Sequence, residues 1–414
     1  MNIKFERVQW PVGHGGFHTG RIKGGRADFR YFFDCGAYST EGKALIRDKL
    51  ATVDFDFGVI SHFDHDHYSE LASAKKVKVL FLPYMTQADM VLQALADQAA
   101  NGLTVKQAFQ GFNVLRQLQN SGTRIVMVDG RGEMRDDVRR GNLEELQGGL
   151  SLSIPSVKNA AKNTQEMQHE AGVEILQGSA TLVYFKFFNH RMEEASNAFA
   201  IQLAAAVAAG KLNRADQTAY TNVDDFLADV AAGNAQVVRI NGRAMQGVYK
   251  KTLSAPTLKA SPITGSNLSS LTMFSRSANS RNGGDLHRQN MALRVRGSRC
   301  GMFGREDGWM LTGDLELTPK TWPAFNDHYF YELSECSVFS VPHHASEISL
   351  CEEAVAFLVE QFFVMPVDAE DDKHPANALT ERLVRHGHEI RSLHSVTAAW
   401  ESMVASESLL QIRS

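Results

Sequence analysis

Cysteine is scarce in this chain of 414 residues, which has four cysteines and no two of them at C-x-x-C spacing. This scarcity argues against a disulfide framework and against a zinc site built from cysteine. Apolar runs of the roughly 18 residues that span a membrane are also lacking. The first residues have no apolar core of the kind found in a signal peptide. We therefore expect no membrane association and a cytoplasmic location.

A strong excess of one charge is absent as well. The formal net charge is −4, and the hydrophobic and charged fractions, 43% and 22%, are ordinary for a globular protein. The chain as a whole therefore has no electrostatic attraction for nucleic acid or for an anionic membrane, so any such contact must come from a local patch. The composition leaves the oligomeric state open.

The chain does contain a dense cluster of polar side chains after the apolar run 55–60. Five potential metal ligands lie within six residues: His62, Asp64, His65, Asp66 and His67. Imidazole and carboxylate groups at this density are typical of a site for one or two divalent transition metals. The alternative is an ordinary polar turn after a strand, in which His and Asp are common.

Three more polar groups follow apolar runs that we interpret as strands. Asp314 follows 309–311, the pair His343 and His344 follows 338–341, and His374 lies in the loop after 362–367. In layered α/β architectures, the ends of strands hold site residues in fixed positions while the loops vary. The recurrence of this pattern favours one composite site.

The elements expected along the chain divide it into three parts. Residues 1–107 and 258–414 alternate short strands and helices, whereas 108–257 has Ala-rich helical pieces, a few strands and no chemical motif. Within it, helices are expected over 193–209 and 223–232, each followed by glycine. We interpret 108–257 as an insertion or cap, and 275–289 as a polar loop.

Seven short motifs resemble those of a known family in order and spacing. They are Val12-Gly13-His14-Gly15, Asp34-Cys35-Gly36, His62-Phe63-Asp64-His65-Asp66-His67, Asn267-Leu268-Ser269-Ser270, Met310-Leu311-Thr312-Gly313-Asp314, Val341-Pro342-His343-His344-Ala345-Ser346 and Lys373-His374-Pro375. Together they resemble the metallo-β-lactamase superfamily, and most closely the hydrolase domain of ComEC-type competence proteins. The resemblance covers about residues 5–85 and 265–395. It does not extend to a DNA-channel role, because the chain has no membrane helices.

The resemblance implies an α/β (α+β) fold, an αββα sandwich with a helical or mixed insertion and two divalent metal ions at one edge. Its implied metal ligands are His62 and Asp64 at the first ion, Asp66 and His67 at the second, Asp314 bridging, and His343 or, less favoured, His344. Asp34 would orient ligands, and His65 falls at a variable position of the motif. Zinc is favoured, with manganese or magnesium as alternatives because Asp64 stands where His is commoner.

One ligand that many superfamily members have is not identifiable. It is a separate His between the second motif and the bridging Asp, for which His169, His190 and His287 qualify only by residue type. A weak or empty first site is therefore an open alternative, and so is a metal-poor, non-catalytic interaction module.

The chemistry implied is hydrolysis by metal-bound hydroxide, with Asp66, Asp314 and His374 as catalytic residues. A nuclease or phosphodiesterase is favoured, and a hydrolase of lactones, thioesters or β-lactams is the alternative. His374, and also His14 or His18, could position substrate or protonate a leaving group. Seven arginines between 276 and 305, including Arg294 and Arg296, suit phosphate binding, although a solvated face explains them equally well.

Overall fold

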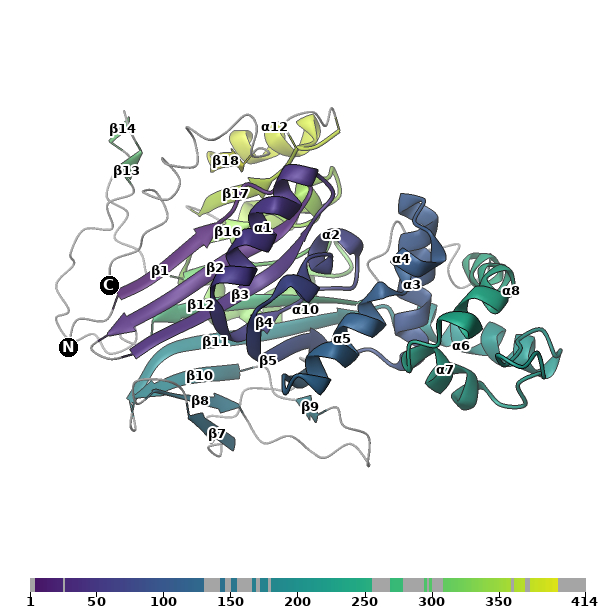
Figure 1. Ribbon diagram of the computed structural model, residues 1–414. Helices are drawn as coiled ribbons and strands as arrows, with labels where there is room; N and C mark the ends of the chain where they lie inside the picture. Colours follow the sequence, from purple (N-terminus) through teal and green to yellow (C-terminus); the bar gives the residue numbers. More distant parts are fainter. Residues whose placement is uncertain are drawn as a thin grey trace.

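A computed structural model describes the protein (Figure 1). The residues described are 4–24, 27–129, 142–145, 150–154, 166–168, 172–177, 180–254, 269–277, 294–295, 298–299, 308–358, 361–368 and 373–393. They form a mixed α/β fold built on two large sheets, so the predicted α/β (α+β) class is confirmed. Within these residues no helix has both the length and the apolar character needed to cross a membrane.

The first sheet has seven strands in the order β1-β2-β3-β4-β5-β6-β9. The first three are antiparallel, and from β3 onward neighbours are parallel. The bounds are β1 Lys4–Gln9, β2 Gly15–Gly24, β3 Ala27–Ala37, β4 Asp54–Val59, β5 Lys76–Pro83, β6 Arg124–Val128 and β9 Glu166–Gln168. Strand β4 is buried from Phe55 to Val59, as expected for a strand inside a parallel sheet.

The second sheet has nine strands in the order β18-β17-β16-β15-β12-β11-β10-β8-β7. Strands β15 to β18 are parallel, and the others pair antiparallel. The bounds are β7 Asn142–Glu145, β8 Leu150–Ile154, β10 Gly172–Gln177, β11 Ala180–Arg191, β12 Ser269–Ser277, β15 Gly308–Leu311, β16 Cys336–Ser340, β17 Phe362–Pro366 and β18 Glu389–Leu393. Strands β13 (Arg294–Val295) and β14 (Ser298–Arg299) pair antiparallel in a separate two-stranded sheet.

Three apolar cores show that the sheets pack face to face with helices outside them. One core combines residues of both sheets, such as Tyr31 and Phe57 from the first and Phe185 and Trp309 from the second. A second core joins the outer face of the first sheet to helices, including α1 (Thr40–Thr52), α3 (Gln87–Asn101) and α5 (Gln110–Asn120). The third joins the outer face of the second sheet to α10 (Trp322–Ser334), α11 (Glu352–Phe357) and α12 (Asn377–Arg385). The layers are thus helix, sheet, sheet and helix.

The region 108–257 is not one continuous insertion. Strands β6 to β11 within it belong to the two sheets, and only its later part is a separate group of helices: α6 (Glu193–Ala208), α7 (Val223–Ala231) and α8 (Ala235–Leu253). These helices lie beside α3 and the short helix α4 (Val105–Ala108) (Figure 1). The expected loop 275–289 begins later than predicted, because Ser275–Ser277 continue β12 opposite β11. The remainder of that loop lies outside the described residues.

A buried histidine on α10 makes stability depend on pH. Burial, together with the charge of Lys186, lowers the pKa of His328 to about 3. Below the unfolded pKa of about 6.5 the unfolded chain binds the proton and the folded chain does not, so stability is lost as the pH falls. We expect this group to cost at most about 1.4 kcal/mol per pH unit below that value. Urea unfolding at pH 7 and 5.5 should show a smaller loss for His328→Phe than for the unaltered protein.

Candidate metal centre

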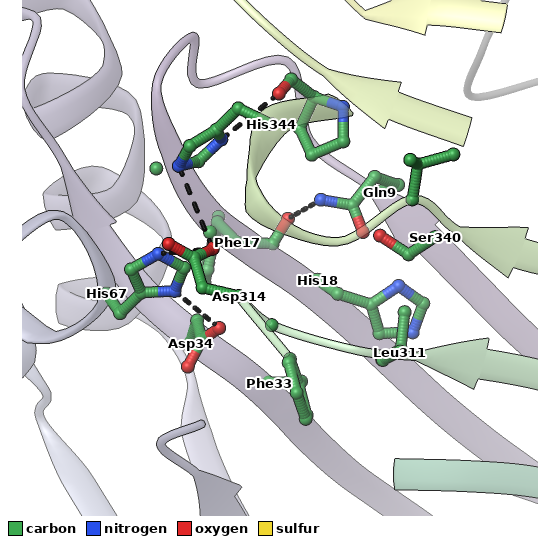
Figure 2. A pocket seen from close by; sticks show the side chains of 15 residues that line it. Gln9, Phe17, His18, Phe33, Asp34, His67, Leu311, Asp314, Ser340 and His344 are labelled. Atoms are coloured by element: carbon green, nitrogen blue, oxygen red, sulfur yellow. Dashed lines mark hydrogen bonds and ion pairs between the residues drawn. The ribbon is translucent and has the colours of Figure 1, made fainter. Parts of the chain in front are cut away.

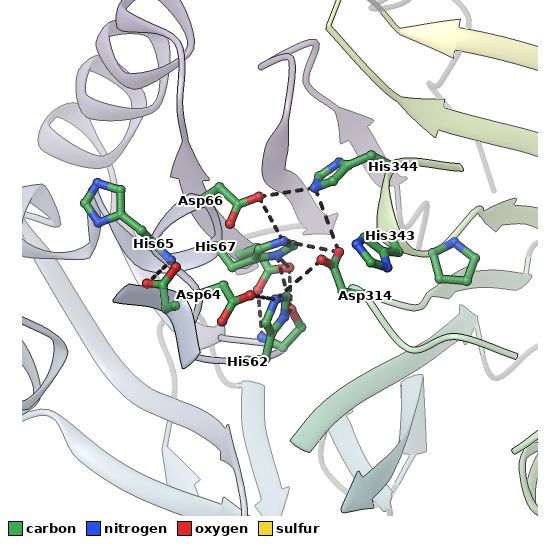
Figure 3. Close-up of polar contacts among 12 residues, drawn as sticks. His62, Asp64, His65, Asp66, His67, Asp314, His343 and His344 are labelled. Carbon is green, nitrogen blue, oxygen red and sulfur yellow. Dashed lines mark hydrogen bonds and ion pairs between the residues drawn. The ribbon is translucent and has the colours of Figure 1, made fainter. Parts of the chain in front are cut away.

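The loops that follow β4, β15 and β16 bring the predicted ligands together (Figure 3). Residues 61–64 and helix α2 (His65–Tyr68) follow β4, Asp314 follows β15, and a turn over His343–Ala345 follows β16. Because these strands lie inside parallel segments of the two sheets, their carboxyl ends project toward one edge. The cluster after β4 and Asp314 are about 250 residues apart in the sequence, and the packing of one sheet on the other brings them together.

One buried group of potential ligands consists of His62, His67 and Asp314. The Nε2 atom of His67 lies 3.3 Å from Asp314 Oδ1, and Nε2 of His62 lies 3.6 Å from Asp314 Oδ2. Neither Nε2 atom has a hydrogen-bond partner, and both are buried. Two imidazole nitrogens and a carboxylate that converge in this way could hold a metal ion.

A second buried group consists of Asp66, His67 and His344, so His67 belongs to both. Asp66 Oδ2 lies 3.5 Å from Nε2 of His67 and 3.2 Å from Nε2 of His344. The same His344 nitrogen is 3.9 Å from Asp314 Oδ1. Asp314, a member of the first group, therefore also adjoins the second. One of its oxygens faces His62, and the other faces His67 and His344.

Asp64 adjoins the first group. Its Oδ2 lies 3.6 Å from Nε2 of His62, and its Oδ1 accepts a hydrogen bond of 2.5 Å from Gln93 on α3. The neighbouring His65 points away from the groups, with its ring near Tyr38 and Tyr68. Its backbone N–H donates to Asp97, also on α3.

Asp34 holds the ligand loop from behind. Its Oδ2 lies 2.9 Å from Nδ1 of His67 and accepts a hydrogen bond from the Ser61 hydroxyl, while its Oδ1 accepts from the Ser61 backbone N–H at 2.7 Å. An ionised carboxylate can only accept, so Nδ1 of His67 carries the hydrogen and Nε2 faces Asp314. This arrangement is the usual way in which a carboxylate fixes the orientation of a metal-binding imidazole.

The charges of the site depend on one another. Burial opposes the imidazolium form of His67, but the neighbouring Asp314, Asp66 and Asp34 outweigh it and raise its pKa well above the usual value. Burial likewise opposes ionisation of Asp314 and Asp66, yet the surrounding imidazoles lower the pKa of both carboxyl groups. Asp314 and Asp66 therefore remain charged in a buried place that is rich in imidazole, as a cation site requires, whereas burial raises the pKa of Asp64.

The backbone is strained where it presents these side chains. Asp34 has a φ of 56°, and three successive residues after β16, His343, His344 and Ala345, have φ values of 49°, 50° and 60°. Non-glycine residues in this left-handed region each cost on the order of 1–3 kcal/mol and concentrate at functional sites. Ala345, which stands where the resembled motif has glycine, thus keeps the left-handed conformation despite its Cβ.

The resemblance favoured His343 as the metal ligand, but the structure places His344 in the ligand group. The Nδ1 atom of His344 lies 3.2 Å from the carbonyl oxygen of Pro366 and donates to it, which directs Nε2 at Asp66. The Nδ1 atom of His343 instead lies 3.0 Å from Glu316. Burial opposes the charge on His343, but the hydrogen bond to Glu316 raises its pKa to about 9.

Two of the other expected histidines lie beside the site. The ring of His14 is 4.9 Å from that of His344 and 5.1 Å from that of His374, which also faces His343 at 6.5 Å. His18 instead lies between the sheets, with its ring 5.0 Å from Trp309. Burial and the charge of Arg7 lower the pKa of His18, so it is a neutral core residue.

The remaining candidates lie elsewhere or cannot be placed. His190 is on β11 opposite Ser270 and belongs to neither ligand group. His169, His287 and Arg296 lie outside the described residues, and Arg294 is placed only as part of β13. Sequence reasoning missed Ser61, Gln93 and Asp97. Of these three, only Ser61 could have been found from the sequence, because it is adjacent to the cluster. The two α3 residues lie about 30 positions further along the chain.

A small cavity of about 30 Å³ lies directly behind the centre (Figure 2). Asp34, His67 and Asp314 line it on one side, and Gln9, His18 and Ser340 line it as well. The volume is sufficient for a water molecule, which needs polar partners of this kind.

Glycines let the backbone approach the ligand loop closely, which makes Gly36→Ala informative. A Cβ at Gly36 would lie 2.4 Å from the carbonyl carbon of Asp66. We expect Gly36→Ala to displace Asp66 and His67 and to weaken metal binding by about 100-fold, since misplacement by 1 Å has effects of this size. Gly247→Ala on α8, where a Cβ meets nothing within 4 Å, is the matched control and should leave binding unchanged. Equal metal affinity in the two variants would contradict this account of the loop.

No protein-family model matches the chain, and no curated protein matches it. Membership of the metallo-β-lactamase superfamily therefore stays a prediction. The described residues nevertheless contain two buried groups of His and Asp side chains that could hold metal ions.

Proposed function

We propose that this protein is a metal-dependent hydrolase of the metallo-β-lactamase superfamily and that it cleaves phosphodiesters, as a nuclease or phosphodiesterase. The observation that carries the proposal is the pair of buried ligand groups that share His67, with Asp314 of the first group also 3.9 Å from His344 of the second. The layer order of helix, sheet, sheet and helix and the order of the seven motifs support the superfamily assignment.

The side chains fit two divalent cations. His62, Asp64 and Asp314 would hold one, and Asp66, His67 and His344 the other, with Asp314 available to both. The two unpartnered Nε2 atoms of His62 and His67 support this assignment, because buried imidazole nitrogens are otherwise hydrogen-bonded. Mixed nitrogen and oxygen donors favour zinc, with manganese or magnesium as alternatives.

When bound, a pair of such cations lowers the pKa of water to about 7 and stabilises both oxygens of an in-line displacement at phosphorus. The residues of the chain hold the ligands in position. Asp34 keeps His67 in one tautomer, and Pro366 does the same for His344 through its carbonyl oxygen. The ring of His14 lies 4.9 Å from that of His344 and 5.1 Å from that of His374, so an imidazole N–H of this pair could donate to a leaving oxygen.

Hydrolysis assays after metal loading test this function. The protein, stripped with chelator and reloaded with zinc or manganese, should hydrolyse bis(p-nitrophenyl) phosphate and cleave single- or double-stranded DNA or RNA. Hydrolysis of nitrocefin, a lactone or a thioester without phosphodiester cleavage would reassign the substrate class to small carbonyl compounds. If neither metal restored any hydrolysis, the enzyme proposal would be wrong and the chain would be better explained as an interaction module.

A further inference from the structure

Helix α3 contacts the ligand loop at two residues one helical turn apart. Gln93 donates from Nε2 to Oδ1 of Asp64 at 2.5 Å, and one turn later Asp97 accepts the backbone N–H of His65 at 3.2 Å. Gln93 and Asp97 are both fully buried. A buried amide and a buried carboxylate cost free energy unless they are hydrogen-bonded, so these two contacts account for Gln93 and Asp97 on the buried face of the helix.

The bond from Gln93 determines which way the Asp64 carboxylate points. With Oδ1 held by the amide, Oδ2 is the oxygen directed toward Nε2 of His62, 3.6 Å away. Asp64 is buried near Asp66 and Asp314, which carry the same charge. The neutral amide of Gln93 orients Asp64 without adding a further charge. A side chain that contacts a ligand and not the metal acts by orienting the ligand.

Helix α3 is itself firmly placed. Thr86 and Asp89 form a capping box at its start, and Gly102, with a φ of 63°, ends it. Asp89 also pairs with Arg191, at the end of β11, at 2.7 Å, and both side chains are largely buried. On its other side the helix contacts α6, α7 and α8. The position of Gln93 is therefore set by the helical group and by the second sheet.

We propose that Gln93 is a positioning residue for the first metal site, through which α3 and the helices packed on it fix Asp64. This inference rests on the proposed function. Among the described residues the first ligand group contains no third histidine, and Gln93 gives Asp64 the orientation that another ligand would impose.

Metal titration of Gln93→Met tests the proposal, because methionine keeps the volume of glutamine and removes the donor. Isothermal titration of zinc into chelator-stripped protein should give two equivalents for the unaltered chain. For Gln93→Met we expect one equivalent at unchanged affinity and the other weakened by about 10- to 100-fold. Gln87→Ala, at an exposed position on the same helix, is the matched control and should behave as the unaltered chain.

A double-mutant cycle with Asp64→Asn separates positioning from other roles. If Gln93 acts through Asp64, the double variant should bind zinc no more weakly than Asp64→Asn alone. Additive losses, or two equivalents at full affinity in Gln93→Met, would overturn the inference while leaving the proposed function intact. Absence of zinc binding in the unaltered chain would overturn both. If Gln93→Met did not fold, Gln93→Ala would take its place, and failure of both to fold would assign Gln93 a structural role instead.

Discussion

Asp314→Ala is expected to abolish phosphodiester hydrolysis and to reduce metal binding at both sites. Asp314 contacts both ligand groups, because one carboxylate oxygen faces His62 and the other faces His67 and His344. Loss of an outer-shell group costs about 10- to 100-fold in metal affinity, so loss of this shared ligand should cost more than about 100-fold. Zinc titration and hydrolysis of bis(p-nitrophenyl) phosphate measure the two effects.

The matched control for this change is Asp327→Ala, which removes an exposed carboxylate from α10. It should leave both metal affinity and hydrolysis at the level of the unaltered protein. Hydrolysis retained by a folded Asp314→Ala variant would show that the reaction does not use this centre.

His344→Ala and His343→Ala are expected to differ sharply although the residues are adjacent. His344 Nε2 faces Asp66 at 3.2 Å, so its removal should weaken one metal site by more than about 100-fold. His343 is paired with Glu316, so its removal should change metal affinity by less than about tenfold. Metal stoichiometry after dialysis against a weak chelator distinguishes the two variants. The reverse order of effects would restore the assignment that the resemblance favoured.

Local patterns in the sequence were sufficient to identify the elements that carry the site. The run at 55–60 overlaps β4, the runs at 309–311 and 338–341 overlap β15 and β16, and the expected helices at 193–209 and 223–232 overlap α6 and α7. Periodicity and caps report on a few neighbouring residues, and these are decided by local chemistry. The same reasoning places Asp314 after β15 and the two histidines after β16.

The choice between His343 and His344 could not be made in that way. It depends on three successive left-handed residues and on the carbonyl of Pro366 in a neighbouring strand, and neither is visible in a two-residue motif. The interpretation of 108–257 as an insertion or cap rests on its Ala-rich helical pieces and on its lack of a chemical motif, but its strands β6 to β11 belong to the two sheets. Its strands pair with segments distant in the chain, as β11 does with β12, and such pairing is specified by the whole sheet.

Gln93 illustrates the same limit for function. Nothing in the sequence links it to Asp64, 29 residues earlier, because the contact exists only once α3 packs across the ligand loop. Side chains that orient ligands reach them only in the folded protein, so they are not visible in the sequence. The ligands themselves form a dense sequence motif.

The central claim is that one buried centre holds two divalent cations, and elemental analysis of metal content tests it most directly. Protein loaded with excess zinc or manganese and dialysed against metal-free buffer should retain two equivalents per chain, and Asp314→Ala treated in parallel should retain fewer than one. Equal retention by both proteins, or no retained metal in the unaltered chain, would contradict the account.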